Sequence, residues 1–410
     1  MTDDASTTAV PTPYHRKRPS AWRSRALPLL QVTAVTLAVL LVSGASVATV
    51  ALAKLGTAIS HNSLDISNGT DAPVAPPATI RAFEGGFNIL AVGADNAEGQ
   101  FDADARTATL NDVNILLHVS ADHQSAVALS LPRDLVIAQP DCVDPVTGEE
   151  FGAVSAQPLN ASFGRGGLGC VRSTIEELTG LSIPYAAVFT FAGTVAMSDA
   201  VGGVPICLNE AVNDPASGLD LPAGTSVVSG QQALSYLRSR SGVGDGSDLS
   251  RISSQQAYMS SLMRVMKSSE TLTNVPKLLK LATAAAENVG LSESLANLNT
   301  MASMALTLKD LNLDRLVFAQ FPVVEDPNNR YKVVPDEELA ALLLEKITTD
   351  QPFTLGADSL STAVTLDPAS PGATAPAPDA TESIPPITAP DVIDGLKGQL
   401  GSQQTCSVAN

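Results

Sequence analysis

The sequence predicts an α/β fold in which a central mixed sheet is flanked by helices in α-β-α layers. Strand-like and helix-like patterns alternate between residues 86 and 353, and such alternation is typical of layered α/β or α+β domains. An uncharged apolar segment lies before this region, and a segment rich in proline and alanine follows it. We therefore expect one folded domain over residues 86–353, one transmembrane helix before it, and a disordered tail with a terminal cysteine over residues 354–410.

The apolar segment is residues 26–53, ALPLLQVTAVTLAVLLVSGASVATVALA, which contain no charged residue. This length suffices to cross a hydrocarbon core of ~30 Å with some tilt. A cleaved signal peptide is the alternative, because small residues near the end of the segment offer a cleavage site, but the length favours an uncleaved anchor. Five basic residues precede the segment: Arg16, Lys17, Arg18, Arg23 and Arg25.

This distribution of basic residues predicts a single-pass protein of the cell membrane. Residues 1–25 would be a cytoplasmic tail, and the folded domain would be extracytoplasmic. Residues 54–85 are rich in proline and small residues, so they are expected to form a linker between the membrane helix and the domain.

The composition is acidic: 42 Asp and Glu residues against 24 Lys and Arg residues give a net charge of −18. An acidic body repels nucleic acid, and the sequence has no RNA-binding motif, so no nucleic-acid partner is expected. Four cysteines in an extracytoplasmic domain predict disulfides, and their spacing does not indicate zinc. The sequence leaves three connectivities open for Cys142, Cys170, Cys207 and Cys406.

A strand and a hairpin open the expected domain. FNILAVGA, residues 87–94, is typical of a buried strand. DVNILLHVS, residues 112–120, alternates in the manner of a half-buried strand, and the turn ADHQ leads to a second alternating segment, SAVALSLPRDL. These two segments predict a hairpin. The apolar positions of the first are Val113, Ile115, Leu117 and Val119.

Helical patterns follow. They cover residues 170–181, 189–203, 229–238, 247–268, 275–289, 298–308 and 335–348, with strands expected at 204–208 and 316–324. Ser229 with Gln232 three residues later predicts a capping box. Asp248 is the expected N-cap of the longest of these helices.

Arginines are concentrated in residues 236–256, YLRSRSGVGDGSDLSRISSQQ. Arg238 and Arg240 lie two residues apart in a segment expected to be extended, so their side chains can converge. Arg251 falls in the first turn of the next helix, with Gln255 on the same face, and a helix amino terminus beside arginines suits an anion. Because a guanidinium fits phosphate oxygens, the pattern predicts a phosphate site. The alternative is a solvated loop of weak ion pairs.

Charged residues also stand where the first strands begin or end. Asp95 follows the first strand, and Asp112 opens the second. Two carboxylates beside a phosphate site suit Mg²⁺ rather than zinc, although aspartate is also frequent in turns and caps. Arg133 and Asp134 end the third strand, where they could join the site or form a local pair that holds a turn.

Together these segments resemble the LytR-CpsA-Psr family of cell-wall glycopolymer transferases, and the cysteines and the Ala/Pro tail look like its actinobacterial branch. The resemblance runs from Phe87 to Phe353, below a single amino-terminal anchor. It rests on an ordered set of motifs: NILAVGAD, LNDVNILLHVSADH, LPRDL, LNASFGRGGLGCVRSTIEELTGLSI, DAVGGVPICL, DPASGLDLPAGTSVVSGQQALSYLRSRSG and DLSRISSQQ.

The resemblance implies a membrane-anchored phosphotransferase that uses Mg²⁺. Such an enzyme moves a glycopolymer with its proximal phosphate from a polyprenyl-pyrophosphate carrier, whose lipid lies in an apolar groove, to peptidoglycan. By motif position, Asp95 and Asp112 would hold Mg²⁺, and Asp248 would orient the arginines or handle a proton. Asp134 and Asp248 are both candidates for the general base. The implied catalytic residues are Arg133, Arg238, Arg240, Asp248 and Arg251. The implied pyrophosphate ligands are Arg133, Arg238, Arg240, Arg251 and Gln255.

The sequence departs from the family pattern at three places. Many members carry arginine where this chain has Ala97, Arg-Ser-Asp where it has LND, and arginine where it has Ser254. Each difference removes one possible phosphate contact. The alternative function is therefore a non-catalytic binder of lipid-linked wall precursors or of cell-wall glycan.

Two structural expectations remain. Cys142 and Cys170 flank a loop beside the implied site, so we expect them to pair, which leaves Cys207 to pair with Cys406. Three methionines of the long helix are expected in the core, with the lining of a lipid groove as the alternative. They are Met259, Met263 and Met266.

Overall fold

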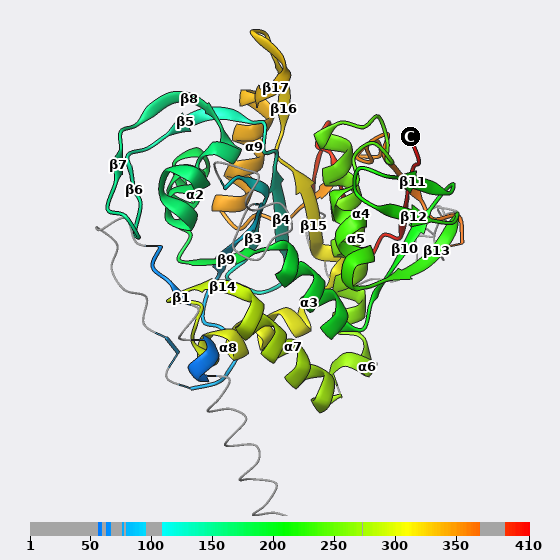
Figure 1. Ribbon diagram of the computed structural model, residues 1–410, viewed down its shortest axis with the longest axis horizontal. Coiled ribbons are helices and arrows are strands. Elements are labelled where there is room, and N and C mark those ends of the chain that lie inside the picture. The colour runs from blue at the N-terminus through cyan, green and yellow to red at the C-terminus, as the bar shows by residue number, and fades with distance from the viewer. Residues whose placement is uncertain are drawn as a thin grey trace, which may run out of the picture. The chain divides into compact units, whose positions relative to one another are not determined.

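An eight-stranded mixed sheet forms the centre of the fold (Figure 1). The computed structural model describes residues 56–59, 63–66, 76–77, 79–95, 109–272, 274–369 and 390–410. The strands lie in the spatial order β1 (Ser63–Leu64), β14 (Val289–Ser292), β9 (Tyr185–Phe189), β2 (Phe87–Ala94), β3 (Asn111–Val119), β4 (Ala126–Leu131), β15 (Leu316–Gln320) and β21 (Gly398–Leu400). The expected mixed α/β architecture is confirmed.

Strand directions bring several strand ends to one edge of this sheet. Strand β2 is parallel to β9, and β4 is parallel to β15. Strand β3 runs antiparallel to both β2 and β4. The carboxyl ends of β2, β4, β9 and β15 therefore lie at the same edge as the amino end of β3. We call this the carboxyl edge.

Helices cover both faces of the sheet. Helices α2 (Phe163–Thr179) and α9 (Glu337–Thr348) lie on one face, where Ile175 and Leu343 share a core with Leu90 of β2. Figure 1 shows both helices on the same side of the strands. The centre of this core is fully buried, because Ile175, Leu343 and Leu90 each have no exposed surface.

The other face is covered by α5 (Asp248–Lys267), α7 (Val275–Asn288) and α8 (Leu298–Asp310). Met304 of α8 and Phe318 of β15 are buried together in this second core. The three methionines of α5 are half-buried. They pack against the second core or against a third one, as expected: Met259, Met263 and Met266.

The third core lies between helices and a smaller sheet. Its helices are α3 (Phe191–Val201) and α4 (Gly230–Arg238), and Tyr236 and Tyr258 are buried at its centre. The four-stranded sheet has the order β13 (Gly224–Val228), β10 (Val204–Leu208), β22 (Thr405–Ser407) and β19 (Val364–Leu366).

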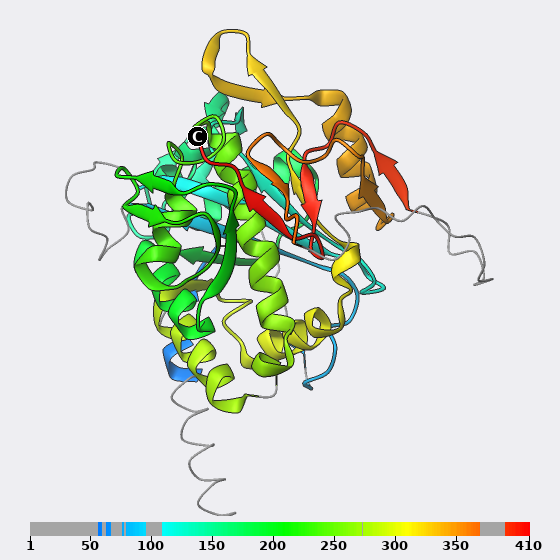
Figure 2. The same cartoon turned by 90° about the vertical axis from the view of Figure 1, so that its right-hand side faces the viewer.

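The remaining elements are short. Paired strands are β5 (Val136–Gln139) with β8 (Val154–Pro158), β6 (Cys142–Val143) with β7 (Glu150–Phe151), β11 (Val212–Asp214) with β12 (Leu219–Leu221), β16 (Val323–Asp326) with β17 (Asn329–Pro335), and β18 (Phe353–Leu355) with β20 (Asp391–Ile393). Short helices are η2 (Leu159–Ala161), α6 (Ser269–Leu272) and η3 (Leu313–Arg315). The β16–β17 hairpin follows β15 and projects from the body (Figure 2).

The predicted hairpin is confirmed as β3 and β4. The expectation that β3 is half-buried is wrong, because the strand is central in the sheet and both of its faces are covered. Leu116 packs on the side of α2, whereas Ile115 and Leu117 pack on the side of α8. A strand buried on both faces needs apolar side chains on both.

The expectation of a disordered tail over residues 354–410 is wrong for the residues described there. Strand β21 joins the central sheet and β22 joins the smaller one. Ile393 and Leu396 are each 1% exposed, and both side chains are buried in the first core. The average composition of the tail is dominated by residues 370–389, which lie outside the described residues, and it conceals these apolar positions.

The segment expected to be a linker, residues 54–85, contributes to the fold where it is described. Strand β1 pairs with β14 at the end of the central sheet. Ile59 and Ile66 are buried, one in each of the two cores beside that sheet. The expected cytoplasmic tail and membrane helix lie outside the described residues. Within the described ranges, no helix combines the length and the apolarity needed to cross a membrane.

Two predicted helix starts need correction. Ser229 is the N-cap of α4, but its side chain makes no cap hydrogen bond, so no capping box with Gln232 forms. The N-cap of α5 is Ser247, whose hydroxyl accepts the Ser250 backbone N–H at 3.2 Å, and Asp248 is the first helical residue. The Asp248 carboxylate is instead bound by arginines.

Both disulfides form as expected. Cys142 pairs with Cys170, and Cys207 pairs with Cys406. The second disulfide joins register partners of β10 and β22, so it fixes the carboxyl-terminal strand to the body.

Candidate active site

Arg133 links the strand ends at the carboxyl edge. It follows β4, and its Nη1 lies 2.7 Å from Oδ1 of Asp112, the second residue of β3. Its Nε lies 3.3 Å from Oδ1 of Asp248 in the first turn of α5. The hairpin register therefore places Arg133 between a strand and a helix that are more than one hundred residues apart in the sequence.

Arg251 completes the contact between α5 and β3. Its Nη2 lies 2.7 Å from Oδ1 of Asp248, one helical turn earlier, and donates a hydrogen bond to the backbone oxygen of Asp112 at 2.8 Å. Arg251 is 5% exposed and Asp248 is 8% exposed. Such burial of charges is costly unless they are paired, which explains why the two residues share one contact.

The pKa values reflect this crowding. Burial raises the pKa of Asp248, and the guanidiniums of Arg251, Arg133 and Arg240 offset part of the rise. Burial lowers the pKa of Arg251. Burial also acts to lower the pKa of Arg133. The charges of Asp112 and Asp248 outweigh burial, so the pKa of Arg133 is raised. The effect of Arg240 on Asp248 places its charge in the same cluster.

The three guanidiniums have unused donors. The Nε atoms of Arg240 and Arg251 are buried, and neither has a hydrogen-bond partner in the part of the chain that the structure describes. Arg133 Nε is also buried without a hydrogen bond, although ion pairs bring it to 3.3 Å from Asp248 and 3.7 Å from Asp134. A buried donor without an acceptor is costly. Three carboxylates lie against these guanidiniums, those of Asp112, Asp134 and Asp248, and all three contact Arg133. An anion with several acceptor oxygens would satisfy the remaining donors.

Two further predicted ligands make their contacts outside this cluster, and Arg238 ends α4 instead of lying in the expected extended segment. The Arg238 guanidinium stacks on the Phe191 ring, 4.4 Å from its centroid, where α3 follows β9 at the carboxyl edge. The Gln255 amide donates to the backbone oxygen of Leu237 at 2.9 Å, so it joins α5 to the end of α4. Gln255 thus supports the segment that carries the arginines.

The two predicted metal ligands lie on neighbouring strands. Asp95 follows β2, is 1% exposed, and accepts the Leu110 backbone N–H at 2.8 Å. Asp112 lies one residue beyond Asn111, the register partner of Ala94. Mg²⁺ is usually bound by one or two carboxylates together with phosphate oxygens and water. These hard oxygen donors beside an anion site fit Mg²⁺.

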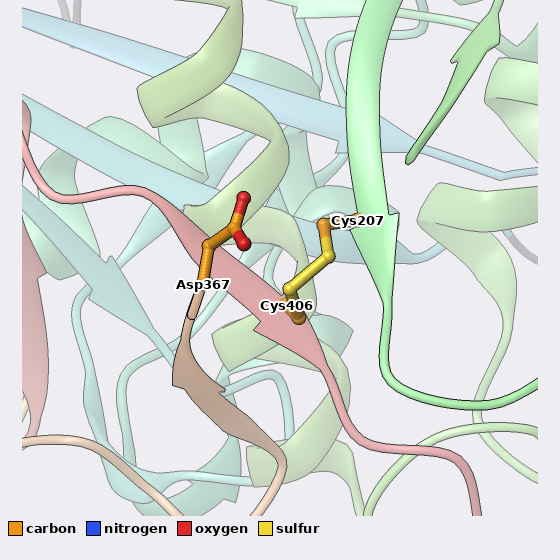
Figure 3. Close-up of side chains that lie close together, drawn as sticks. All are labelled: Cys207, Asp367 and Cys406. Atoms are coloured by element: carbon orange, nitrogen blue, oxygen red, sulfur yellow. A yellow bond between two sulfur atoms is a disulfide. The ribbon is translucent and has the colours of Figure 1, made fainter. Parts of the chain in front are cut away.

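Another group of potential ligands does not fit a metal. Cys207, Cys406 and Asp367 lie close together among the described residues (Figure 3). The sulfur atoms of Cys207 and Cys406 are joined in a disulfide, so neither cysteine can bind a metal as a thiolate. A cavity of about 190 Å³ beside this disulfide is lined by Asp367 and Arg264, away from the arginine cluster.

Lys332 lies next to this cluster but was not predicted. It lies on β17, and its Nζ is 2.5 Å from Oδ1 of Asp134, whose Oδ2 is 3.7 Å from Arg133 Nε. The backbone N–H of Val333 also donates to the oxygen of Asp134 at 3.2 Å. The signal available in the sequence was a basic residue in the hairpin that follows β15, another strand ending at this edge.

Ser254, where many family members carry arginine, is buried on α5. Ser254 is 1% exposed, and its Oγ accepts the hydroxyl of Ser407 on β22 at 3.2 Å. The side chain therefore faces the carboxyl-terminal strand. Ala97 lies outside the described residues.

Comparison with known proteins agrees with this fold. Residues 53–348 match the model of the LytR_cpsA_psr family. Because the match covers more than half of the chain, this protein belongs to the LytR-CpsA-Psr family, as its motifs predicted.

The chain is similar to several named members. It is 35% identical over 271 residues to "Cell wall biosynthesis protein LcpA" of Corynebacterium glutamicum, a match that covers 59% of this chain and 51% of LcpA. The chain thus spans about half the length of that relative. It is 23% identical over 299 residues to "Polyisoprenyl-teichoic acid--peptidoglycan teichoic acid transferase TagT" of Bacillus subtilis, covering 68% of this chain and 85% of TagT.

A solved structure shares the fold. Protein gbs0355 of Streptococcus agalactiae superimposes with a TM-score of 0.51 at 19% identity, covering 65% of this chain and 88% of that protein. The likeness supports the layered arrangement of sheet and helices.

Proposed function

We propose that this protein transfers a glycopolymer, together with its proximal phosphate, from a polyprenyl-pyrophosphate carrier to peptidoglycan. The observation that carries the proposal is the cluster of Arg133, Arg240 and Arg251, whose buried Nε atoms donate no hydrogen bond among the described residues. A diphosphate supplies acceptor oxygens for these donors. Family membership and the transferase name of TagT support the same class of reaction.

The reaction would be an in-line displacement at phosphorus. An acceptor hydroxyl of peptidoglycan attacks the sugar-linked phosphorus, a new P–O bond forms, and the bond to the polyprenyl phosphate breaks. Negative charge then develops on the leaving phosphate. Arg133, Arg240 and Arg251 would stabilise that charge in place, which is the main source of catalysis in phosphoryl transfer. Arg238 would add a fourth cation from beside α3.

The two candidate bases differ in access. Both carboxylate oxygens of Asp248 are buried, and two arginines bind this residue, so Asp248 would orient them. The Asp134 side chain is 19% exposed and lies beside Arg133. Asp134 can therefore be reached by an acceptor hydroxyl, and we assign it the proton that this hydroxyl releases.

Asp95 and Asp112 would hold Mg²⁺ at the carboxyl edge. When bound, the ion would neutralise charge on the diphosphate oxygens. The sequence of residues 26–53 supports an anchor that keeps the site outside the membrane, where the lipid-linked donor and peptidoglycan are both accessible.

The test measures release of polyprenyl phosphate from a pyrophosphate-linked disaccharide donor by the full chain. Arg240→Ala should lower the rate by roughly 10²–10³-fold, as expected for loss of one preorganised charge donor. The control is Arg81→Ala, because Arg81 is 62% exposed and pairs only locally with Glu84. Chelation of divalent ions should stop turnover, and added Mg²⁺ should restore it.

Unchanged turnover in Arg240→Ala would refute the role of the cluster. A wild-type protein that binds the donor but never releases polyprenyl phosphate would instead be a non-catalytic binder. In that case added Mg²⁺ would not produce any polyprenyl phosphate.

A further inference from the structure

Asp214 is a buried carboxylate that the proposed reaction does not use. It ends β11 and is 2% exposed. The hydroxyl of Ser239 donates to its Oδ2 at 2.7 Å, and the hydroxyl of Ser241 donates to its Oδ1 at 2.7 Å. The backbone N–H of Ala216 also donates to Oδ1, at 3.1 Å. Each carboxylate oxygen therefore accepts a hydrogen bond from one serine hydroxyl.

The two serines flank Arg240. Ser239 leaves α4 with φ −61° and ψ 128°, and a turn follows in which the Val243 backbone N–H donates to the Arg240 oxygen at 3.2 Å. Asp214 binds the hydroxyls on both sides of Arg240, so it restrains the backbone from which the Arg240 side chain extends. The charge of Arg240 acts on Asp248, at the centre of the cluster.

Residues 239–242 pack closely against Asp214. A Cβ atom on Gly242 would lie 3.0 Å from the Cβ of Asp214 and 2.8 Å from the Oγ of Ser239. These distances leave no room for a side chain. Residues 239–242 are therefore held against the β11–β12 pair by packing as well as by hydrogen bonds.

Asp214 remains ionised under any physiological condition. Burial acts to raise its pKa, but the hydroxyls of Ser241, Ser239 and Ser217 and the Ala216 N–H outweigh burial and lower the pKa to about 2. Hydrogen bonds to an ionised carboxylate are about twice as strong as neutral ones. By contrast, the Arg240 Nε has no partner among the described residues, so the guanidinium depends on its backbone for position.

We infer that Asp214 is a positioning residue that fixes the segment Ser239–Arg240–Ser241 and so aims the Arg240 guanidinium into the anion site. This inference rests on the proposed function for the identity of the ligand, a diphosphate. Asp214 acts through Arg240 and does not touch the ligand. Its loss should therefore matter only while Arg240 is present.

The experiment is a double-mutant cycle on the full chain, with inorganic pyrophosphate and Mg²⁺ as the probe in titration calorimetry. Asp214→Asn should weaken binding about tenfold, or about 1.4 kcal/mol, and should cause no further loss in an Arg240→Ala background. The matched control is Asp220→Asn on the exposed side of β12, which should bind as wild type does. Equal losses from Asp214→Asn with and without Arg240 would overturn the inference, as would wild-type affinity.

A second pair of variants covers the case in which Asp214→Asn does not fold. Ser241 is exposed apart from its hydroxyl contact. Ser241→Ala should weaken pyrophosphate binding, and Ser241→Thr, which keeps the hydroxyl, should restore it. Equal affinities of Ser241→Ala and Ser241→Thr would contradict the positioning role.

A last measurement separates this inference from the proposed function. If the wild type fails to bind pyrophosphate, the proposed ligand is wrong. The position of Arg240 can still be read from its Nε–H resonance in arginine-labelled protein, which is assigned by its disappearance in Arg240→Ala. Ser241→Ala should shift this resonance and Ser241→Thr should not. An unshifted resonance in Ser241→Ala would refute the positioning role on its own.

Discussion

Removal of the Cys207–Cys406 disulfide should have the largest effect on stability of any change distant from the charged cluster. The two cysteines are 199 residues apart in the sequence. In the chain-entropy treatment, closing a loop of that length stabilises by about 5 kcal/mol, whereas the 28-residue separation of Cys142 and Cys170 corresponds to about 3.5 kcal/mol. The double variant C207A/C406A should therefore lose more free energy of unfolding than C142A/C170A.

The same change should also reach the arginine site. Val408 accepts the Gly244 backbone N–H at 2.8 Å, and Asn410 donates to the backbone oxygen of Ser241 at 3.1 Å. The Tyr236 hydroxyl also bonds to Ser407 at 2.6 Å. The carboxyl-terminal strand thus contacts the loop that follows Arg240. Without its covalent link, β22 retains only two register pairs with β10.

The assay is denaturant unfolding of both double variants, followed by pyrophosphate titration of each folded protein. We expect the loss from C207A/C406A to exceed that from C142A/C170A by about 1–2 kcal/mol, with weaker pyrophosphate binding in C207A/C406A. The reasoning is refuted if C142A/C170A loses as much stability. Wild-type affinity in C207A/C406A would refute the link between the strand and the site.

Three other changes follow from the charged groups. Asp248→Asn should cost about 3–5 kcal/mol of unfolding free energy in urea, because Arg251 and Arg133 lose a buried counter-charge; a cost below 1 kcal/mol would contradict the pairing. Asp214 has its pKa lowered from 3.8 to about 2, so its contribution of about 2 kcal/mol is present above pH 4 and is lost as the pH falls toward 2. The unfolding free energy of Asp214→Asn should not show this loss between pH 4 and pH 2. The same pH dependence in Asp214→Asn and in the wild type would contradict the lowered pKa of Asp214. Lys332→Met should weaken pyrophosphate binding about fivefold, or about 1 kcal/mol, with little change in stability because its pair with Asp134 is partly exposed; wild-type affinity would place Lys332 outside the site.

The part of the fold that could be predicted was the part with local signals. The β3–β4 hairpin follows from alternation across a short turn, and its register brings Arg133 beside Asp112. The role of residues 390–410 could not be predicted, because their strands are short and pair with partners far away in the sequence. Strand β22, for example, pairs with β10 through Cys207 and Cys406. Composition averaged over the tail carries no information about such pairing.

The candidate site also contains residues that local patterns predict and residues that they do not. Arg251 and Asp248 are one helical turn apart, so their contact is local and predictable. Lys332 and Asp214 reach the site through hairpins whose direction depends on the assembled sheet, and neither stands in a pattern that indicates phosphate. Gln255 was predicted as a ligand but donates to a backbone oxygen of α4. Helical periodicity places a residue on a face but does not identify what lies opposite.

An acidic protein can still bind an anion because the distances that matter are short. At physiological ionic strength the Debye length is about 8 Å, so most of the net charge of −18 is screened from the cluster. Arg133, Arg240 and Arg251 are buried or half-buried around one carboxylate, where screening is weak and each contact counts for more. Asp112, Asp134 and Asp248 pair with these guanidiniums and keep them together before any ligand binds, while the buried Nε atoms still donate no hydrogen bond among the described residues. The acidic carboxylates at this edge therefore assemble the cationic site, and the oxygens of the ligand complete its hydrogen bonds.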